Sequence, residues 1–189
     1  MIVSNHMETA AKSLIDALKN EKKRLHMTNA NVIHLNVVPQ IAFNSTTSNY
    51  RTHRKPQGLW YGIETSWIEW CADNMPDKLS DFIYDIRINE NLILKIRNKK
   101  EFDDFEKTYG IKIYDKKFYS NQQNYIDFHS VAEKYCGIEI SPFLTDKEDS
   151  NWYCGWDCAS GCIWDAKAII AIKLYAQFDE ETASYIRVD

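Results

Sequence analysis

One twelve-residue segment, residues 152–163, constrains the fold more than any other part of the sequence. It holds two of the six tryptophans, three of the five cysteines, two glycines and one acid, Asp157. Large aromatic rings mixed with glycines and an acid are typical of a segment that lines a pocket. Residues 55–62 have the same character, with Trp60 and Tyr61 among glycines. We therefore expect these two segments to meet around one site.

Length and composition narrow the class of protein. The chain of 189 residues predicts one domain, residues 1–189, and its net charge of -4 gives no global sign of nucleic-acid binding. No run of about 18 apolar residues occurs, so we expect no contact with a membrane. The first residues do not resemble a secretory signal, and the odd number of cysteines argues against a complete disulfide framework. We therefore expect a cytoplasmic protein with reduced thiols.

Periodicity predicts how helices and strands follow one another. Helical spacing of apolar residues predicts a helix over about residues 7–26, followed by a core over about residues 30–178. Alternating or β-branched runs predict strands at residues 32–39, 58–62, 111–114, 137–141, 161–164 and 168–178. Helices are also expected at residues 66–74, 99–109 and 127–135. Without a β-α-β rhythm, this mixture predicts an α+β domain with mixed, mostly antiparallel sheets and flanking helices.

Two local patterns make sharper predictions. Ser66 and Glu69 fit a capping box, in which the serine caps the helix and the glutamate bonds back to it. Residues 81–88 and 91–97 both alternate apolar and polar side chains, with Asn89-Glu90 between them. That dipeptide suits a hairpin turn, so we expect the two strands to pair.

Three cysteines, Cys154, Cys158 and Cys162, are spaced four residues apart. On one helix face, with His129 or Cys136 as a fourth ligand, they could bind a soft metal. The two glycines between them disfavour a helix, and no local signature supports a Cys–His nucleophile. We therefore predict no metal site and interpret these thiols as small buried hydrophobic groups.

Two carboxylates are the candidate catalytic acids. Glu139 lies between Ile138 and Ile140 in a predicted strand, so its side chain points away from theirs. It belongs either to a solvent-facing side of the strand or to the floor of a cleft. Asp157, flanked by a tryptophan and a cysteine, is either a turn residue or an acid of a site.

Polar residues in the first third of the chain are candidate ligand contacts. His34 and Asn36 share one face of a predicted strand, which suits a cleft, although a structural histidine is the alternative. Arg51 and His53 belong to a basic loop beside Tyr50. This loop is either solvated or binds phosphates of a dinucleotide, RNA or DNA, with the tyrosine available for stacking.

The order of these features resembles that of ADP-ribosyltransferase-fold proteins. Such proteins carry a first strand with His or Arg, a second strand with an aromatic residue before a helix, and a late strand with an acid. Here residues 32–35 (VIHL) resemble the first element, and residues 58–62 (GLWYG), followed by residues 66–74, resemble the second. Residues 135–139 (YCGIE), with residues 162–165 (CIWD), resemble the late segment of phage and bacterial members.

The resemblance also has departures that bear on the catalytic acid. Gly62 stands where many members have Ser or Thr, and Ser160 stands where an acid is expected in the closing strand. No Glu-x-Glu or Gln-x-Glu pair occurs there. The acid is therefore Glu139 or Asp157, or the fold carries a binding module without chemistry.

The resemblance implies transfer of ADP-ribose from NAD to a macromolecular acceptor. His34 would contact the adenine-side ribose or diphosphate, with the phosphate-binding loop of Arg51 and His53 nearby, and Trp60 and Tyr61 would wall in the nicotinamide. A carboxylate would stabilise the oxocarbenium-like sugar. Members of this style resemble toxins of phage–bacterium conflict, which suggests an antitoxin partner. RNA, DNA and protein all remain candidate acceptors.

Two other functions compete with this one. The first is a non-catalytic module that binds nucleic acid or protein through its aromatic residues and basic loop. The second is a small metal-dependent hydrolase. Nucleotide chemistry of the Walker or Rossmann type is disfavoured, because the sequence has no such glycine loop.

Overall fold

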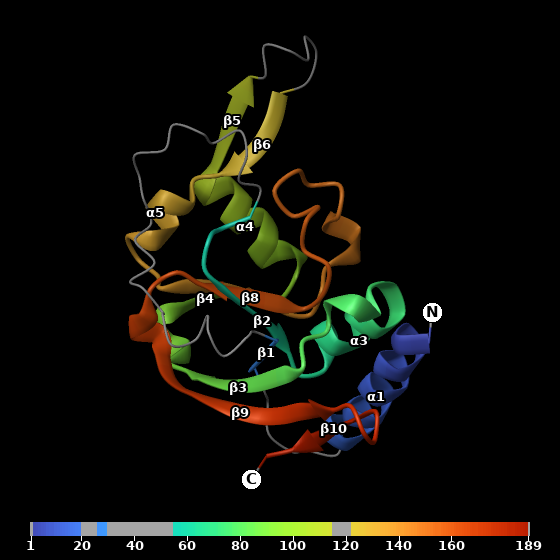
Figure 1. Ribbon diagram of the computed structural model, residues 1–189. Coiled ribbons are helices and arrows are strands. Elements are labelled where there is room, and N and C mark those ends of the chain that lie inside the picture. The colour runs from blue at the N-terminus through green and yellow to red at the C-terminus, as the bar shows by residue number, and fades with distance from the viewer. Residues whose placement is uncertain (1, 20–25, 30–54, 115–121, 189) are drawn as a thin grey trace.

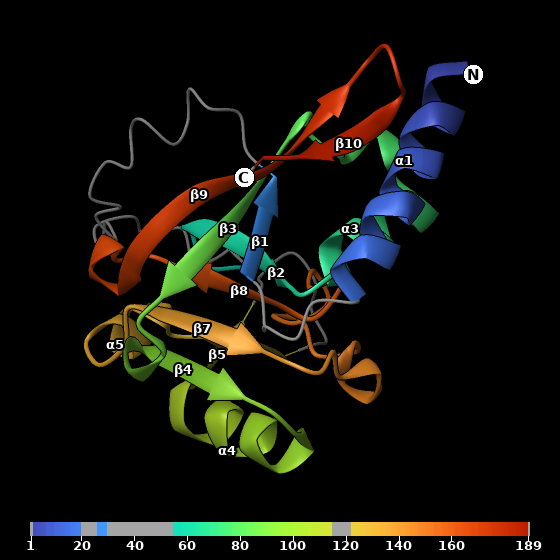
Figure 2. The ribbon, with the colours of Figure 1, turned by 90° about the horizontal axis from the view of Figure 1, so that it is seen from below.

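The computed structural model describes residues 2–19, 26–29, 55–114 and 122–188. Eight strands in these ranges form one curved sheet, in the order β10-β9-β3-β1-β2-β8-β7-β4 (Figures 1 and 2). Every neighbouring pair is antiparallel except the parallel pair β4–β7. The predicted α+β class with mostly antiparallel strands is confirmed. The strands are β1 (His26–Asn29), β2 (Leu59–Ile63), β3 (Phe82–Ile88), β4 (Ile93–Ile96), β7 (Gly137–Ile140), β8 (Ser160–Ile163), β9 (Ile169–Asp179) and β10 (Ser184–Arg187).

Helices cover opposite ends of this sheet (Figure 2). α1 (Ile2–Lys19) packs against α3 (Ser66–Asn74) and β10, whereas α4 (Lys99–Tyr109) lies by the other edge, near β4. A separate two-stranded ribbon, β5 (Gly110–Tyr114) and β6 (Gln122–Ile126), extends away from the sheet before the short helix α5 (Phe128–Ala132). None of the helices in the described ranges is long and apolar enough to cross a membrane.

The buried apolar residues divide between the two faces of the sheet. At the α1 end, the helical stripe Ala11, Leu14, Ile15 and Leu18 packs on Ile68 and its neighbours in α3. At the α4 end, one face of β4, β7 and β8 packs against the aromatic residues of α4 and of the segment before β8, residues 152–159. The other face of the sheet carries a third cluster from β2, β3, β4 and β8, with Tyr61, Ile63, Ile86, Ile88, Ile93 and Ile163. Each fully buried aliphatic side chain stabilises the fold by about 1.5–3 kcal/mol. Burial on both faces therefore determines which way the side chains of these strands point.

The aromatic residues of the segment before β8 fill core rather than line a pocket. Trp152 and Tyr153 are fully buried, and Trp156 is nearly so. The ring centroids of Phe102 and Trp152 lie 4.9 Å apart, and Trp152 Nε1 donates to Glu106 Oε1 at 2.7 Å. The prediction that these three rings line a pocket is therefore wrong, because α4 supplies apolar and acidic partners that cover them.

Helix ends differ from two sequence predictions. The described part of the first helix ends at Lys19, and His26 already begins β1, so the helix does not extend to about residue 26 as predicted. The capping box at Ser66 is also wrong. Thr65 is the N-cap residue and makes no side-chain cap, while Ser66 Oγ donates to the carbonyl of Ala159 at 2.5 Å. That bond ties the start of α3 to the segment before β8.

The predicted hairpin between residues 81–88 and 91–97 is also wrong. Both runs form strands, but β3 pairs with β1 and β9, whereas β4 pairs with β7. Between them, the side chain of Asn89 accepts from the backbone of Asn91 and caps a short 3-10 turn, Glu90–Leu92. This turn directs the chain away from β3 and toward the edge of the sheet.

The remaining predicted elements are confirmed within a few residues. Strands occur near residues 58–62, 111–114, 137–141, 161–164 and 168–178, and helices near residues 66–74 and 99–109. The helix expected at residues 127–135 is shorter, since α5 covers only Phe128–Ala132. The strand predicted at residues 32–39, which carries His34, lies outside the described residues, as do Arg51 and His53.

Candidate functional site

Four neighbouring strands place polar residues in one row across the sheet. Tyr61 on β2 lies opposite Gly161 on β8, Gly161 lies opposite Glu139 on β7, and Glu139 lies opposite Lys95 on β4. Residues opposite each other in a sheet point to the same face. The row therefore brings a phenol, a carboxylate and an ammonium group together on one face.

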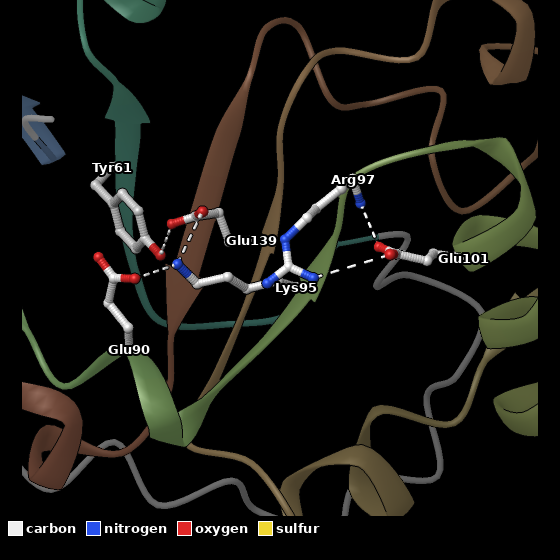
Figure 3. Close-up of polar contacts among 6 residues, drawn as sticks. All are labelled: Tyr61, Glu90, Lys95, Arg97, Glu101 and Glu139. Carbon is white, nitrogen blue, oxygen red and sulfur yellow. Dashed lines mark hydrogen bonds and ion pairs between the residues drawn. The ribbon is translucent and has the colours of Figure 1, made fainter.

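The carboxylate of Glu139 lies at the centre of this row (Figure 3). Only 2% of the residue is exposed. The Tyr61 hydroxyl donates to Glu139 Oε2 at 3.1 Å, and Lys95 Nζ lies 3.6 Å from Oε1. Lys95 Nζ also donates to Oε2 of the exposed Glu90 at 2.6 Å. A buried carboxylate is thus linked to the surface through one lysine.

Gly161 is what allows Tyr61 to reach Glu139 across the strand between them. A Cβ at this position would lie 2.4 Å from Cζ and 2.5 Å from the hydroxyl oxygen of Tyr61. Such distances are far inside van der Waals contact, so a side chain here would displace the phenol. The bare glycine backbone leaves the space that the ring fills.

The direction of Glu139 agrees with the sequence prediction, but its exposure does not agree with the solvent-facing interpretation. Ile138 and Ile140 pack into the aromatic core beside α4, and Glu139 points to the other face. That face is covered rather than wet, since the apolar residues around Tyr61 pack on it. The solvent-facing interpretation is therefore wrong, and the position on the floor of a cleft stays a prediction.

Tyr84 adds a second polar group on this face. It lies on β3, two and four residues from Ile86 and Ile88, which pack beside Tyr61. Its hydroxyl is buried and has no hydrogen-bond partner in the described part of the chain. Burial also raises the pKa of this phenol, so the neutral hydroxyl persists as a donor. A buried polar atom without a partner costs free energy that a bound ligand could recover.

Trp60 points to the opposite face from Tyr61, because successive residues of a strand alternate. Its ring lies 4.9 Å from that of Trp156, and Lys55 Nζ lies 5.1 Å from the Trp60 ring centroid. Lys55 Nζ also lies 3.3 Å from Oδ2 of Asp157. Asp157 is therefore a partly exposed member of an ion pair beside Trp60.

The predicted site residues accordingly fall into two groups. Tyr61 joins Glu139 on one face, and Trp60 joins Asp157 and Lys55 on the other. The expectation that Trp60 and Tyr61 together wall one pocket is wrong, because strand alternation separates their rings. His34, Arg51 and His53 lie outside the described residues.

Sequence reasoning missed Lys95, Glu90, Gly161 and Tyr84. One signal was present: residues 93–96 (ILKI) and 137–140 (GIEI) are apolar strands that each carry one charge, of opposite sign. Strands buried on both faces rarely hold a lone charge. An ion pair between Lys95 and Glu139 could therefore have been predicted. The parallel pairing of the two strands, which brings these residues together, could not.

The cysteines near the C-terminus do not form a helical face. Residues 151–155 form turns, and Cys162 lies in β8. Burial raises the pKa of Cys158 to about 11 and that of Cys71 to about 12, and it also raises the pKa of Cys162. In the described ranges, no three His, Cys, Asp or Glu residues are grouped closely enough to hold a metal ion.

Comparisons with protein-family models, curated proteins and solved structures find no match for this chain.

Because Tyr61 packs directly over Gly161, we expect one added methyl group at position 161 to destabilise the fold. We expect Gly161→Ala to lower the free energy of unfolding by about 1–3 kcal/mol, because the phenol must move. Gly155→Ala is the matched control, since the nearest atom there is Cε of the flexible Lys55 side chain at 2.7 Å. We expect the control to stay within about 0.5 kcal/mol of the original chain in urea unfolding. An unchanged unfolding midpoint for Gly161→Ala would contradict the close packing.

We expect replacement by phenylalanine to change the free energy of unfolding differently at Tyr61 and at Tyr84. Tyr61→Phe removes a hydrogen bond to a buried carboxylate and is expected to cost about 1.5–3 kcal/mol of unfolding free energy. Tyr84→Phe removes a buried hydroxyl without a described partner, so the stability should stay equal or rise. Urea unfolding of both variants measures the difference, and equal losses would refute the assignment of partners.

Thiol accessibility predicts which cysteine reacts first. At about pH 7.5, iodoacetamide should modify the exposed Cys154 first, because the buried thiols of Cys71 and Cys158 stay protonated far above this pH. Mass spectrometry of partly modified protein locates the label, and Cys154→Ser should remove the fast phase. Early labelling of Cys158 would show that the segment before β8 opens readily, and early labelling of Cys71 would show the same of α3.

Proposed function

We propose that this chain is an NAD-dependent ADP-ribosyltransferase in which Glu139 is the catalytic carboxylate. One observation carries the proposal: a carboxylate lies within the sheet, hydrogen-bonded to Tyr61 and close to Lys95. Catalytic groups are commonly buried polar groups held by neighbours that fix their charge and orientation. The buried Tyr84 hydroxyl on the same face supports a ligand site there, because it offers a donor that the described residues do not use.

The proposed reaction breaks the bond between nicotinamide and the ribose of NAD. The electron pair of that bond leaves with the nicotinamide, and the sugar becomes oxocarbenium-like, as in glycoside cleavage. The ionised Glu139 carboxylate stabilises the positive charge on the sugar. An oxygen or nitrogen of the acceptor then attacks the anomeric carbon and loses its proton. Without an acceptor, water takes this role and free ADP-ribose forms.

Tyr61 has a positioning role in this scheme. Its hydroxyl donates to Glu139 Oε2 at 3.1 Å, which leaves the other carboxylate oxygen toward Lys95. A hydrogen bond from a buried phenol fixes the plane of the carboxylate before the substrate arrives. Preorganised charge of this kind costs no rearrangement during the reaction.

The wider features of the proposal rest on the family resemblance. They include an ADP-ribosyltransferase-like fold, a cytoplasmic location, a toxin-like role and an antitoxin partner. His34 would contact the adenine side of NAD, and Arg51 and His53 would bind phosphates near an RNA, DNA or protein acceptor. Asp157 is the weaker choice for the catalytic acid, because it is partly exposed and paired with Lys55.

A second candidate function is a binding module without catalysis. The observation that favours it is the cluster of Trp60, Lys55 and Asp157, which is partly exposed and lies on the other face from Glu139. An aromatic ring beside a cation suits stacking of a base or contact with a protein. This function requires no turnover of NAD.

Release of nicotinamide from NAD tests the proposal. NAD labelled in the nicotinamide should release the label on incubation with the chain, and adenine-labelled NAD should transfer label to an acceptor when RNA, DNA or lysate protein is added. We expect Glu139→Gln to reduce release by about 100-fold or more. This variant keeps an oxygen that can accept from Tyr61, so the fold should persist, as circular dichroism can check.

Asp157→Asn is the matched control for the loss of a carboxylate. It removes only a partly exposed ion pair, so the rate should stay within about threefold of the original chain. A full rate in Glu139→Gln together with a loss in Asp157→Asn would move the catalytic role to Asp157. Absence of nicotinamide release under every acceptor condition would overturn the proposed activity and favour the binding module.

A further inference from the structure

We infer that Lys95 is a positioning residue that keeps the Glu139 carboxylate ionised, and that Glu90 limits this effect by competing for the same lysine. The inference rests on the proposed function, since it assigns a role to two residues beside the proposed catalytic acid.

The lysine lies between two carboxylates of very different exposure (Figure 3). Its Nζ is 2.6 Å from Glu90 Oε2 and 3.6 Å from Glu139 Oε1. The side chain of Glu90 is 52% exposed, that of Lys95 is 14% exposed and that of Glu139 is 3% exposed. Charge therefore alternates from the surface inward: negative, positive, negative.

Burial alone would drive Glu139 toward its neutral, protonated form, because a low-dielectric surrounding disfavours charge. A cation within about 4–6 Å has the opposite effect and favours the ionised form. At 3.6 Å, Lys95 lies inside that range. An ionised carboxylate is what the proposed reaction requires, because a neutral acid cannot stabilise a positive sugar.

Glu90 weakens this support in two ways. Its negative charge opposes ionisation of Glu139, and its shorter contact holds the ammonium group toward the surface. The Asn89 cap fixes the backbone of the turn that carries Glu90, Glu90–Leu92, and the hydrogen bond from Lys95 holds the Glu90 carboxylate beside the lysine. Lys95 therefore contacts both carboxylates and does not pair with Glu139 alone.

The neighbouring strands place two polar groups beside Glu139. From β2 comes the Tyr61 hydroxyl, from β8 only the bare Gly161, and from β4 the ammonium group of Lys95. From β3, Ile86 and Ile88 pack against this face with apolar side chains. The sign of each substitution below follows from this arrangement.

Titration of the Glu139 carboxyl by NMR, in protein with carbon-labelled glutamate and without NAD, measures the effect directly. The signal is assigned by its loss in Glu139→Gln. We expect Lys95→Met to raise the titration midpoint by about 1–3 pH units, because the cation is gone. Glu90→Gln should lower the midpoint by about half a unit, because a competing negative charge is gone. Lys95→Arg should stay within about half a unit of the original chain, because it keeps the charge.

Lys100→Met is the control for loss of a lysine. Lys100 pairs with Asp104 on the exposed side of α4, so its removal should leave the Glu139 midpoint unchanged. If Lys95→Met does not fold, Glu90→Gln still decides the sign, because Glu90 is exposed and its substitution should be tolerated. Midpoints that stay within about two tenths of a unit in the Lys95 and Glu90 variants would overturn the inference.

Nicotinamide release, measured against pH, separates this inference from the proposed function. On the acid side of the profile, the rate of nicotinamide release falls as Glu139 becomes protonated. The pH at which it falls should be higher for Lys95→Met and lower for Glu90→Gln. Each shift should equal that of the NMR midpoint. Shifted midpoints without any nicotinamide release would overturn the proposed function and leave the coupling of the three residues standing. Release with unmoved midpoints would overturn the role of Lys95 alone.

Discussion

Burying the Glu139 carboxylate inside a sheet costs free energy that only polar partners can offset. The structure supplies those partners from two strands that are remote in sequence, Tyr61 on β2 and Lys95 on β4. The Tyr61 contact depends on the strand order β2-β8-β7 and on the bare Gly161 between the two residues. The Lys95 contact depends on the parallel pairing of β4 with β7. Apolar residues would pack at this position without such requirements, which is why the arrangement suggests function rather than stability alone.

The same sheet keeps two polar clusters apart. One face carries the Tyr61–Glu139–Lys95 row, and the opposite face carries Lys55 and Asp157 beside Trp60. The aromatic core beneath α4 fills the space between the second cluster and the helix, with Trp156 in contact with Trp60. A reaction at Glu139 and a binding event at Trp60 would thus occur on separate surfaces of one sheet.

Local sequence patterns predicted elements well and their partners poorly. Alternation located most strands and showed that Glu139 points away from Ile138 and Ile140, since it depends only on neighbours in the chain. Alternation could also have shown that Trp60 and Tyr61 diverge once residues 58–62 are taken as a strand. The parallel pairing of β4 with β7, which sets Lys95 beside Glu139, depends on contacts between distant segments. The place of Gly161 opposite both Tyr61 and Glu139 depends on register, which local patterns do not specify.

The most direct test of the central claim is a crystal structure of the chain with a carbocyclic NAD analogue that cannot lose nicotinamide. We expect the carbocyclic ring on the nicotinamide side to lie against the Glu139 carboxylate, on the face that carries Tyr61 and Tyr84. An analogue seated on the opposite face, beside Trp60 and Lys55, would contradict it. So would a Glu139 carboxylate that stays sealed beneath packed side chains while the analogue binds elsewhere.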